Sequence, residues 1–299
     1  MAPPGITEIP PTTAKPRKLS RRRFLQLAAT AGVAGLAADG FLIEPNRPQI
    51  VRKEIGLRRW PERLEGFSVA LLSDFHYDPH FSVHPISTAI EMVNDLRPDL
   101  IALTGDFVSM PWAGDPQPSA AAAEPCAHLF RNLRAPFGLW AVLGNHDAFS
   151  DPDRVTGALR AEGIQVLVNQ AAAIETNSAR FWLSGVDDVL GRSADLDATL
   201  SNVPADEATI LLAHEPDYAD RVQRFPVDLQ LSGHSHGGQV VLPLIRPLYL
   251  PELARKYIAG LYQVGPLTLY TNRGIGTVGI PVRWNCPPEI TLLTMRRRA

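Results

Sequence analysis

The feature that most constrains this chain is a pair of histidines, His234 and His236, between an apolar run and two glycines. Residues i and i+2 of an extended backbone point to the same side, so both imidazoles can enter one pocket. The glycines allow the backbone to approach such a pocket more closely than a Cβ atom would permit. Two solvated loop histidines would give the same short pattern, so its meaning depends on the rest of the chain.

Four upstream segments share one build, a strand-like apolar run that ends in residues of the types that bind metals. Their polar ends are Asp74-Phe75-His76, Gly105-Asp106, Gly144-Asn145-His146-Asp147 and His214-Glu215. Short buried strands that end in this way place the polar residues along one edge of a sheet, where open α/β folds bind ligands. Five of the eight histidines lie in these segments and the histidine pair, which favours one shared site over scattered core histidines.

The residues at the ends of these runs offer carboxylates, imidazoles and one side-chain amide as metal ligands, without a thiolate. This set suits Mn²⁺, iron or Zn²⁺ in a catalytic site rather than a structural zinc site. The two cysteines, Cys126 and Cys286, lack the spacing of a zinc site, and one disulfide between them is compatible with an oxidising compartment.

In their order, the motifs D-x-H, G-D, G-N-H-D, H and G-H-x-H resemble those of the calcineurin-like metallophosphoesterase superfamily, from about Phe67 to the C-terminus. The form G-H-S-H-G-G-Q, with N-R-G-I-G at 272–276 and P-E-I at 288–290, further resembles an exported bacterial branch. That branch includes enzymes similar to UDP-2,3-diacylglucosamine hydrolases. The resemblance implies an α/β fold, a four-layer α/β/β/α sandwich of two mainly mixed β-sheets flanked by helices, with a dinuclear metal site at the strand ends.

The resemblance also implies a role for each site residue. Asp106 matches the family's bridging carboxylate. One metal would be held by Asp74, His76 and His236, and the other by Asn145, His214 and His234. His146 matches the residue that protonates the leaving group, and Asp147 would orient it and keep it cationic. Ser109 stands where many members carry an acidic residue, a position that tunes the surroundings of the site rather than binding metal.

A water shared by two cations loses a proton near neutral pH, so this site would hydrolyse phosphate esters with a metal-bridging hydroxide. We expect cleavage of a phosphodiester or pyrophosphate bond in a lipid-linked or nucleotide-sugar substrate of the cell envelope. Two alternatives stay open. One is a nucleotide phosphodiesterase or phosphomonoesterase, and the other is a non-catalytic envelope protein that holds metal. The pair His146-Asp147 argues against the second, because a pure binder needs no proton donor.

Other residues are candidates for the surroundings of the site. Those that would bind a substrate phosphate through paired hydrogen bonds, with ordinary ion pairing as the alternative, are Arg246, Arg273 and Arg283. The apolar, Pro-rich segment 243–251 is expected to pack in the core, with contact to a lipid or membrane as the alternative. The acidic pair Asp187-Asp188 is expected to form a turn or to lie at the rim of the substrate site. His80 and His84 match no ligand motif and are expected at the surface.

The charge of the chain is unevenly distributed. The first 23 residues carry six cations and one anion, a net charge of +5, which leaves −7 on the remainder of a chain whose total is −2. The composition therefore indicates no global basic surface for nucleic acid. The segment Ser20–Gln26 (S-R-R-R-F-L-Q), followed by a small-residue apolar run from Leu27 to Ala38, resembles a twin-arginine export signal in which Gln26 stands where Lys is preferred.

This leader predicts a disordered N-terminus with a twin-arginine signal or anchor over residues 1–45, followed by one metallophosphoesterase domain over residues 46–299. The apolar run is too short and too rich in Ala and Gly to predict a membrane span by itself, and Asp39 interrupts it, although an uncleaved signal would still act as an anchor. Export would place the protein in the periplasm or on the outer face of the cytoplasmic membrane, with the twin-arginine machinery as a partner. The alternative is a cytoplasmic protein with a basic tail.

Apolar patterning predicts most secondary-structure elements. Strands are expected at 50–57, 67–73, 99–104, 138–143, 164–168, 171–176, 180–186, 208–213, 228–231, 261–264, 267–271 and 289–295, and from Val240 onward. Helices are expected at 85–96, 120–133 with an interruption at Pro125, 151–162 and 216–224. The order of strands and helices favours an α/β domain.

Overall fold

The computed structural model describes residues 20–298 except residues 112, 177–178 and 246. The chain divides into two units, residues 1–38 and 39–299, each described here by itself. The predicted disorder of residues 1–19 lies outside the described residues, as does the side chain of Arg246.

The described part of the first unit is one helix, α1 (Arg21–Ala38), in which no residue is buried. Helical structure continues along the chain into the second unit as η1 (Asp39–Ile43) and η2 (Glu44–Asn46). By length and composition the combined segment 21–46 is long and apolar enough to cross a membrane, since an 18-residue window within it has a mean hydropathy of 1.4. Asp39 does not end the helical segment, which therefore extends beyond the apolar run identified in the sequence.

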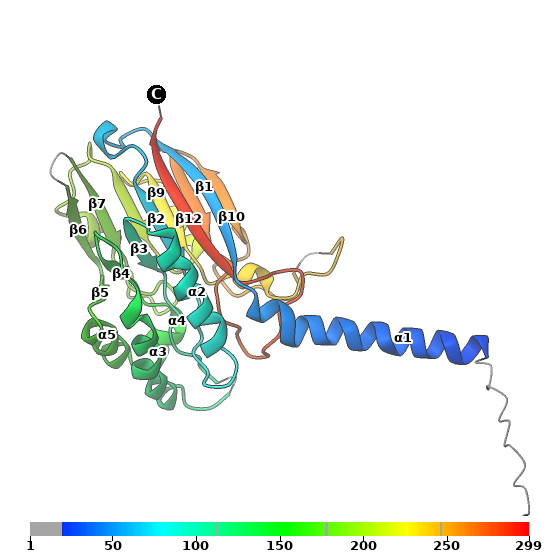
Figure 1. The fold of residues 1–299 in the computed structure, drawn as a ribbon. Helices are drawn as coiled ribbons and strands as arrows, with labels where there is room; N and C mark the ends of the chain where they lie inside the picture. The colour runs from blue at the N-terminus through cyan, green and yellow to red at the C-terminus, as the bar shows by residue number, and fades with distance from the viewer. Residues whose placement is uncertain (1–19, 112, 177–178, 246, 299) are drawn as a thin grey trace, which may run out of the picture. The chain divides into compact units, whose positions relative to one another are not determined.

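Among the described residues, the second unit contains two six-stranded mixed sheets (Figure 1). The first sheet has the order β1 (Gln49–Leu57), β12 (Glu289–Arg297), β2 (Ser68–Leu72), β3 (Leu100–Leu103), β4 (Leu139–Ala141) and β5 (Gln165–Val166). The second has the order β10 (Gly260–Val264), β11 (Leu267–Thr271), β9 (Leu229–Ser232), β8 (Thr209–Leu212), β7 (Arg180–Gly185) and β6 (Gln170–Glu175). The strands β2 to β5 are parallel, as are β7, β8, β9 and β11.

Side chains that alternate along the strands separate the unit into layers. In β2, Val69 and Leu71 lie in the core between the two sheets, whereas Ala70 and Leu72 face the helices outside the first sheet. In β8, Ile210 belongs to the core between the sheets and Leu211 to the core outside the second sheet. Both faces of each sheet are thus buried, which explains the nearly continuous apolar runs. The predicted α/β/β/α sandwich is confirmed.

Helices cover the outer faces of the sheets. Those packed on the first sheet are α2 (Val83–Leu96), α3 (Ala123–Leu129) and α5 (Pro152–Ala161), and those on the second are α6 (Leu196–Leu200) and α7 (Ala219–Val222). The shorter elements are α4 (Asn145–Ser150), η3 (Glu62–Leu64), η4 (Gln117–Ala122), η5 (Phe130–Asn132), η6 (Pro216–Tyr218) and η7 (His236–Gly238). Pro125 is tolerated because it lies in the first turn of α3, where its missing N–H has no intrahelical partner to lose.

Two predictions about the segment after the histidine pair are wrong. No strand begins at Val240, which forms only an isolated bridge with Trp284. The segment 243–251 does not pack in the core, because Leu244, Leu248 and Tyr249 are exposed. Composition alone cannot distinguish an apolar loop that is buried from one that is exposed.

Candidate metal centre

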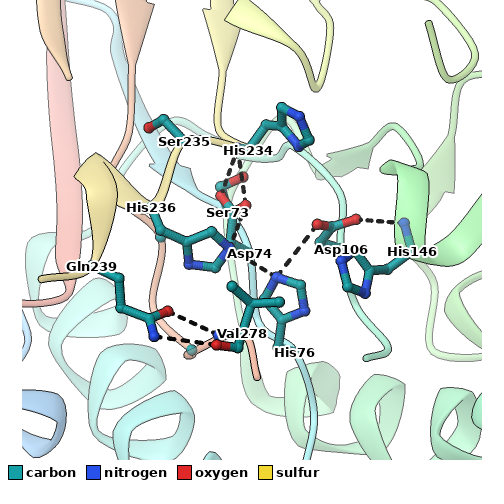
Figure 2. A network of polar contacts seen from close by, with 12 residues as sticks. Ser73, Asp74, His76, Asp106, His146, His234, Ser235, His236, Gln239 and Val278 are labelled. Carbon is teal, nitrogen blue, oxygen red and sulfur yellow. Dashed lines mark hydrogen bonds and ion pairs between the residues drawn. The ribbon is translucent and has the colours of Figure 1, made fainter. Parts of the chain in front are cut away.

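The candidate ligands lie in the loops that follow β2, β3, β4, β8 and β9. Because the carboxyl ends of parallel strands lie at one edge of a sheet, these loops bring both sheets' polar residues together. Gly233 makes the approach possible, since a Cβ atom there would lie 1.8 Å from Ser73 Oγ and 2.3 Å from Asp74 Oδ2. Figure 2 shows the convergence of Asp74, His76, Asp106, His234 and His236.

Five of the ligands have an unusual backbone conformation. Asp74, His76, Asp106, His234 and His236 have φ values of 53°, 41°, 58°, 68° and 51°. A left-handed conformation in a residue other than glycine costs roughly 1–3 kcal/mol and persists only where the surrounding structure imposes it. Their occurrence together is typical of a functional site, in which the turns aim successive side chains at one centre.

The first group of ligands is Asp74, His76, Asp106 and His236, whose ligand atoms all lie within 4.8 Å of one another. The Nε2 atoms of His76 and His236 are 2.9 Å apart. Asp74 Oδ1 lies 3.3 Å from His236 Nε2, and Asp106 Oδ2 lies 3.4 Å from His76 Nε2. Four buried donor atoms of the types that bind divalent cations thus converge on one point.

The second group is Asp106, His214 and His234. His214 Nε2 lies 3.2 Å from Asp106 Oδ2 and 3.2 Å from His234 Nδ1. Asn145 follows β4, and its Oδ1 is buried without a hydrogen-bond partner among the described residues. A metal ion would supply the missing partner of this amide oxygen. Asp106 belongs to both groups, as a carboxylate shared by two cations must.

Burial determines the direction of the pKa shift of four ligands, Asp74, His76, His234 and His236. It raises the pKa of Asp74 to about 6 and lowers the pKa of His234 to about 3, since water no longer stabilises either charge. Burial likewise lowers the pKa of His76 and of His236. Neutral imidazoles keep a lone pair available, which is the form that a metal ion requires.

Asp106 and His214 form a buried ion pair. Burial acts to raise the pKa of Asp106, but the neighbouring His214 and His146 hold that pKa well below its usual value. Asp106 in turn raises the pKa of His214 against the opposing effect of burial. The shared carboxylate therefore stays ionised, and cations at the two groups would replace the proton that it now shares with histidine.

Hydrogen bonds fix the orientation of the ligand histidines. His214 Nδ1 lies 2.5 Å from the carbonyl oxygen of Thr104, and His234 Nε2 lies 2.8 Å from that of Glu252. Ser109 Oγ lies 3.3 Å from His76 Nδ1, so the serine that departs from the family pattern still contacts a ligand. Such partners select the ring nitrogen that faces the metal. Sequence reasoning missed the two carbonyls, because a backbone atom has no residue signature.

His146 lies beside both groups without belonging to either. Its backbone N–H donates to Asp106 Oδ1 at 2.9 Å, and its ring stands edge-on to His76 with centroids 4.6 Å apart. The N–H of Met110 donates to His146 Nδ1 at 2.8 Å. Since Nδ1 is an acceptor, the ring proton is on Nε2. Burial also lowers the pKa of His146, which disfavours the cation that was predicted.

The predicted contact between Asp147 and His146 is not found in the structure. The Asp147 carboxylate accepts hydrogen bonds of 2.8–3.1 Å from backbone N–H groups, namely those of Asp106, Phe107, Val108 and Gly144. This side chain lies in the first turn of α4 and joins the loops after β3 and β4. Asp147 therefore positions the loops that carry Asp106 and Asn145.

The predicted phosphate-binding role of Arg283 is contradicted by the structure. Its guanidinium is fully buried and donates to the carbonyl oxygens of Arg273, Gly274, Gly276 and Cys286. A guanidinium that is fully buried among backbone carbonyls is not accessible to a substrate phosphate. Arg273 is held in an ion pair with Glu289, with 2.5 Å between Nε and Oε2, which matches the alternative of ordinary pairing.

The remaining candidates lie outside the ligand groups. His80 and His84 are exposed, as predicted. Asp188 is buried and accepts a hydrogen bond from the backbone of Gly191, which fits a turn. Both cysteines are buried with free thiols, so the structure contains no disulfide between them.

Two buried ligand groups joined by one aspartate, at the carboxyl edges of two mixed sheets, define a dinuclear metal-dependent hydrolase. The family model of the calcineurin-like phosphoesterases matches residues 67–238, which contain all seven candidate ligands and His146. The chain belongs to this family, and it is a metal-dependent phosphoesterase.

The chain is similar over most of its length to several known proteins. It is 34% identical over 288 residues to the Uncharacterized metallophosphoesterase YkuE of Bacillus subtilis (strain 168), covering 94% of this chain and 99% of that protein. It is 33% identical over 283 residues to the Phosphodiesterase YaeI of Escherichia coli (strain K12), covering 93% and 99%. A Transmembrane protein with metallophosphoesterase domain from Danio rerio is 31% identical over 306 residues, covering 93% and 67%.

Proposed function

We propose that this phosphoesterase acts outside the cytoplasm on a phosphodiester or pyrophosphate bond of a lipid-linked or nucleotide-sugar substrate. The observation that carries the proposed chemistry is the place of Asp106 in both ligand groups, within 3.4 Å of His76 and 3.2 Å of His214. The Escherichia coli relative named as a phosphodiesterase supports the preference for a diester. The apolar segment 21–46 and the resemblance to UDP-2,3-diacylglucosamine hydrolases support an envelope substrate.

The ligand groups would each hold one divalent cation, Mn²⁺, iron or Zn²⁺. One set is Asp74, His76, Asp106 and His236, and the other is Asp106, Asn145, His214 and His234. When bound, two cations supply Lewis-acid stabilisation of phosphoryl oxygens and a water of lowered pKa. His146 would donate a hydrogen bond from its Nε2–H to the leaving oxygen, with Met110 holding the ring in the required tautomer. Full transfer of the proton would take place from the imidazolium form, in which Nδ1 also carries a proton. Asp147 would hold the loops that carry Asp106 and Asn145 in their relative positions.

A second candidate function is hydrolysis of soluble nucleotides, as a phosphodiesterase or phosphomonoesterase. The same ligand set serves either reaction, so substrate preference has to be measured. A substrate panel with added Mn²⁺ would compare bis(p-nitrophenyl) phosphate, p-nitrophenyl phosphate, a cyclic nucleotide, a UDP-sugar and a UDP-linked acylated sugar in detergent. We expect kcat/KM to be higher for the diester than for the monoester, and highest for the acylated substrate. Preference for the monoester or for the soluble nucleotide would contradict the proposal.

Export should depend on the arginines at the start of α1. Replacing Arg21 and Arg22 together with Lys should leave the protein in the cytoplasm, because the twin-arginine route requires both guanidinium groups rather than positive charge alone. Cell fractionation with immunoblotting measures the result. The variant Arg52→Lys, at an exposed position of β1, is the matched control. Undiminished extracytoplasmic recovery of the double variant would overturn the proposed route.

A further inference from the structure

One loop beside the metal centre exposes an unusual amount of apolar surface. Within residues 243–251, Leu244, Ile245, Leu248 and Tyr249 have exposed fractions of 107%, 60%, 65% and 71%. Contact of large neighbouring apolar side chains with water is unfavourable, and such clusters mark interaction sites. Residues 240–251 contain one charge, the cation of Arg246, and no carboxylate. The loop therefore suits a partner that is apolar and accepts positive charge.

A second apolar group lies at the start of the same unit. Phe41, Leu42 and Ile43 are exposed, and so is Ile280. The backbone of residues 39–46 is fixed to the segment that contains Ile280, since Arg283 donates to the carbonyl oxygen of Gly40 at 2.9 Å. Figure 1 shows the segment 39–46, the loop 275–287 and the residues 241–245 and 247–249 on the same side of the sandwich.

Hydrogen bonds also connect this second group to the exposed loop. Gln239 Nε2 donates to the carbonyl oxygen of Ile280 at 3.1 Å. The N–H of Trp284 donates to the carbonyl oxygen of Gln239 at 3.0 Å, and that of Val241 to Trp284 at 2.9 Å. The two apolar groups are therefore parts of one connected surface. We define the docking surface as the exposed side chains of Phe41, Leu42, Ile43, Leu244, Ile245, Leu248, Tyr249 and Ile280.

The position of Phe41, Leu42 and Ile43 in the chain identifies the partner. These residues belong to the segment 21–46, which is long and apolar enough to cross a membrane. Where this segment meets a bilayer, its C-terminal residues lie at the membrane interface, and the hydrogen bonds above hold Ile280 and the exposed loop beside them. Leucine and isoleucine would enter the acyl layer, while Tyr249 suits the interface because its ring is apolar and its hydroxyl polar.

The exposed loop is attached at both ends to metal ligands. It follows Gly238, where a Cβ atom would lie 2.2 Å from Pro247 Cβ, so the loop packs directly on the turn after His236. At its other end, the carbonyl oxygen of Glu252 lies 2.8 Å from His234 Nε2. Contact of the loop with a membrane would therefore place the metal centre next to the lipid headgroups.

We propose that the docking surface inserts into the outer layer of a lipid bilayer and brings the metal centre to the level of the headgroups. The phosphate of an amphipathic phosphoester would then reach the metal centre while the apolar part of that substrate stays in the bilayer. Membrane docking is a separate property from the proposed substrate, because the surface would contact a bilayer whichever phosphoester is hydrolysed. The other occupant that an apolar surface admits is a second copy of this chain, and the experiment below distinguishes the two.

The test measures how strongly lipids quench a fluorescent probe attached to the full chain. The labelled protein is mixed with vesicles of phosphatidylethanolamine and phosphatidylglycerol. Both native thiols are buried, so a bimane label will react selectively with the introduced cysteine of Leu248→Cys. The control is Asp153→Cys, at an exposed position of α5. Spin-labelled lipids should quench the probe at residue 248 several-fold more than the probe at residue 153. Equal quenching at both positions would overturn the proposal.

A second variant shows whether the apolar side chains cause the insertion. Leu244→Asp combined with Leu248→Asp should abolish lipid quenching of a probe at Ile280→Cys, while metal content and turnover of bis(p-nitrophenyl) phosphate stay unchanged. Retained quenching in this variant would contradict the proposal. If, without vesicles, the probe at residue 248 becomes buried as the protein concentration rises and dimers form, the proposal of membrane docking would also be overturned. The partner would then be a second copy of this chain. If the substrate panel shows a preference for the monoester or the soluble nucleotide while lipid quenching is observed, the proposed function is wrong and membrane docking is still supported.

Discussion

Replacing Asp106 with Asn should remove both metal binding and turnover. Asp106 is the carboxylate within reach of both ligand groups, and an amide cannot supply the charge that offsets two cations. If the cations contribute about 4 kcal/mol to transition-state stabilisation, turnover falls roughly 10³-fold, since 1.36 kcal/mol corresponds to a tenfold change in rate. Metal analysis of the purified protein should show fewer than two ions per chain. Steady-state kinetics with bis(p-nitrophenyl) phosphate measures the loss.

The matched control is Asp206→Asn, which makes the same change at an exposed aspartate outside both ligand groups. It should keep the metal content and activity of the unmodified protein. Two bound ions and normal turnover in Asp106→Asn would show that this residue does not bridge the metals.

Replacing His146 with Ala should lower turnover by roughly 10²–10⁴-fold, the usual range for loss of a positioned proton donor, while the metal content is retained. His146 lies outside both ligand groups, and the hydrogen bond from Met110 leaves its proton on Nε2. The loss should depend on the leaving group, because an alkoxide needs a proton whereas p-nitrophenolate leaves without one. An alkyl phosphodiester should therefore be affected more than a p-nitrophenyl diester.

The control for this variant is His84→Ala, a change of the same type at an exposed position of α2. Equal losses of activity on the two diesters would indicate that His146 stabilises charge or positions the substrate instead. Loss of bound metal in His146→Ala would identify it as a ligand, and the division of the site between ligands and donor would then be wrong.

The convergence of the candidate ligands could be predicted from sequence because each of them follows a buried strand. Asp74, Asp106 and His214 lie within three residues of the ends of β2, β3 and β8. Parallel strands end at one edge of a sheet whatever the details of their packing. The order of these motifs carried further information, because it indicated both the family and a shared carboxylate. Strand ends are therefore a dependable source of site residues in this fold.

The contacts around the ligands could not be predicted in the same way. Arginine is a residue type that often binds phosphate, but the guanidinium of Arg283 donates to backbone carbonyl oxygens that only the folded chain brings together. Asp147 follows His146 in sequence, yet helix geometry directs its carboxylate to the backbone of the neighbouring loop. The exposed loop 243–251 was expected in the core because its composition is apolar. Apolar composition indicates burial but does not distinguish burial in the protein core from burial against a partner.

The most direct test of the dinuclear site is a crystal structure of the protein loaded with Mn²⁺, with anomalous differences recorded to locate the ions. Two anomalous peaks are expected about 3.5 Å apart, both in contact with the Asp106 carboxylate. One peak should also contact Asp74, His76 and His236, and the other Asn145, His214 and His234. A single peak, or two peaks that do not share Asp106, would contradict the assignment of a dinuclear site.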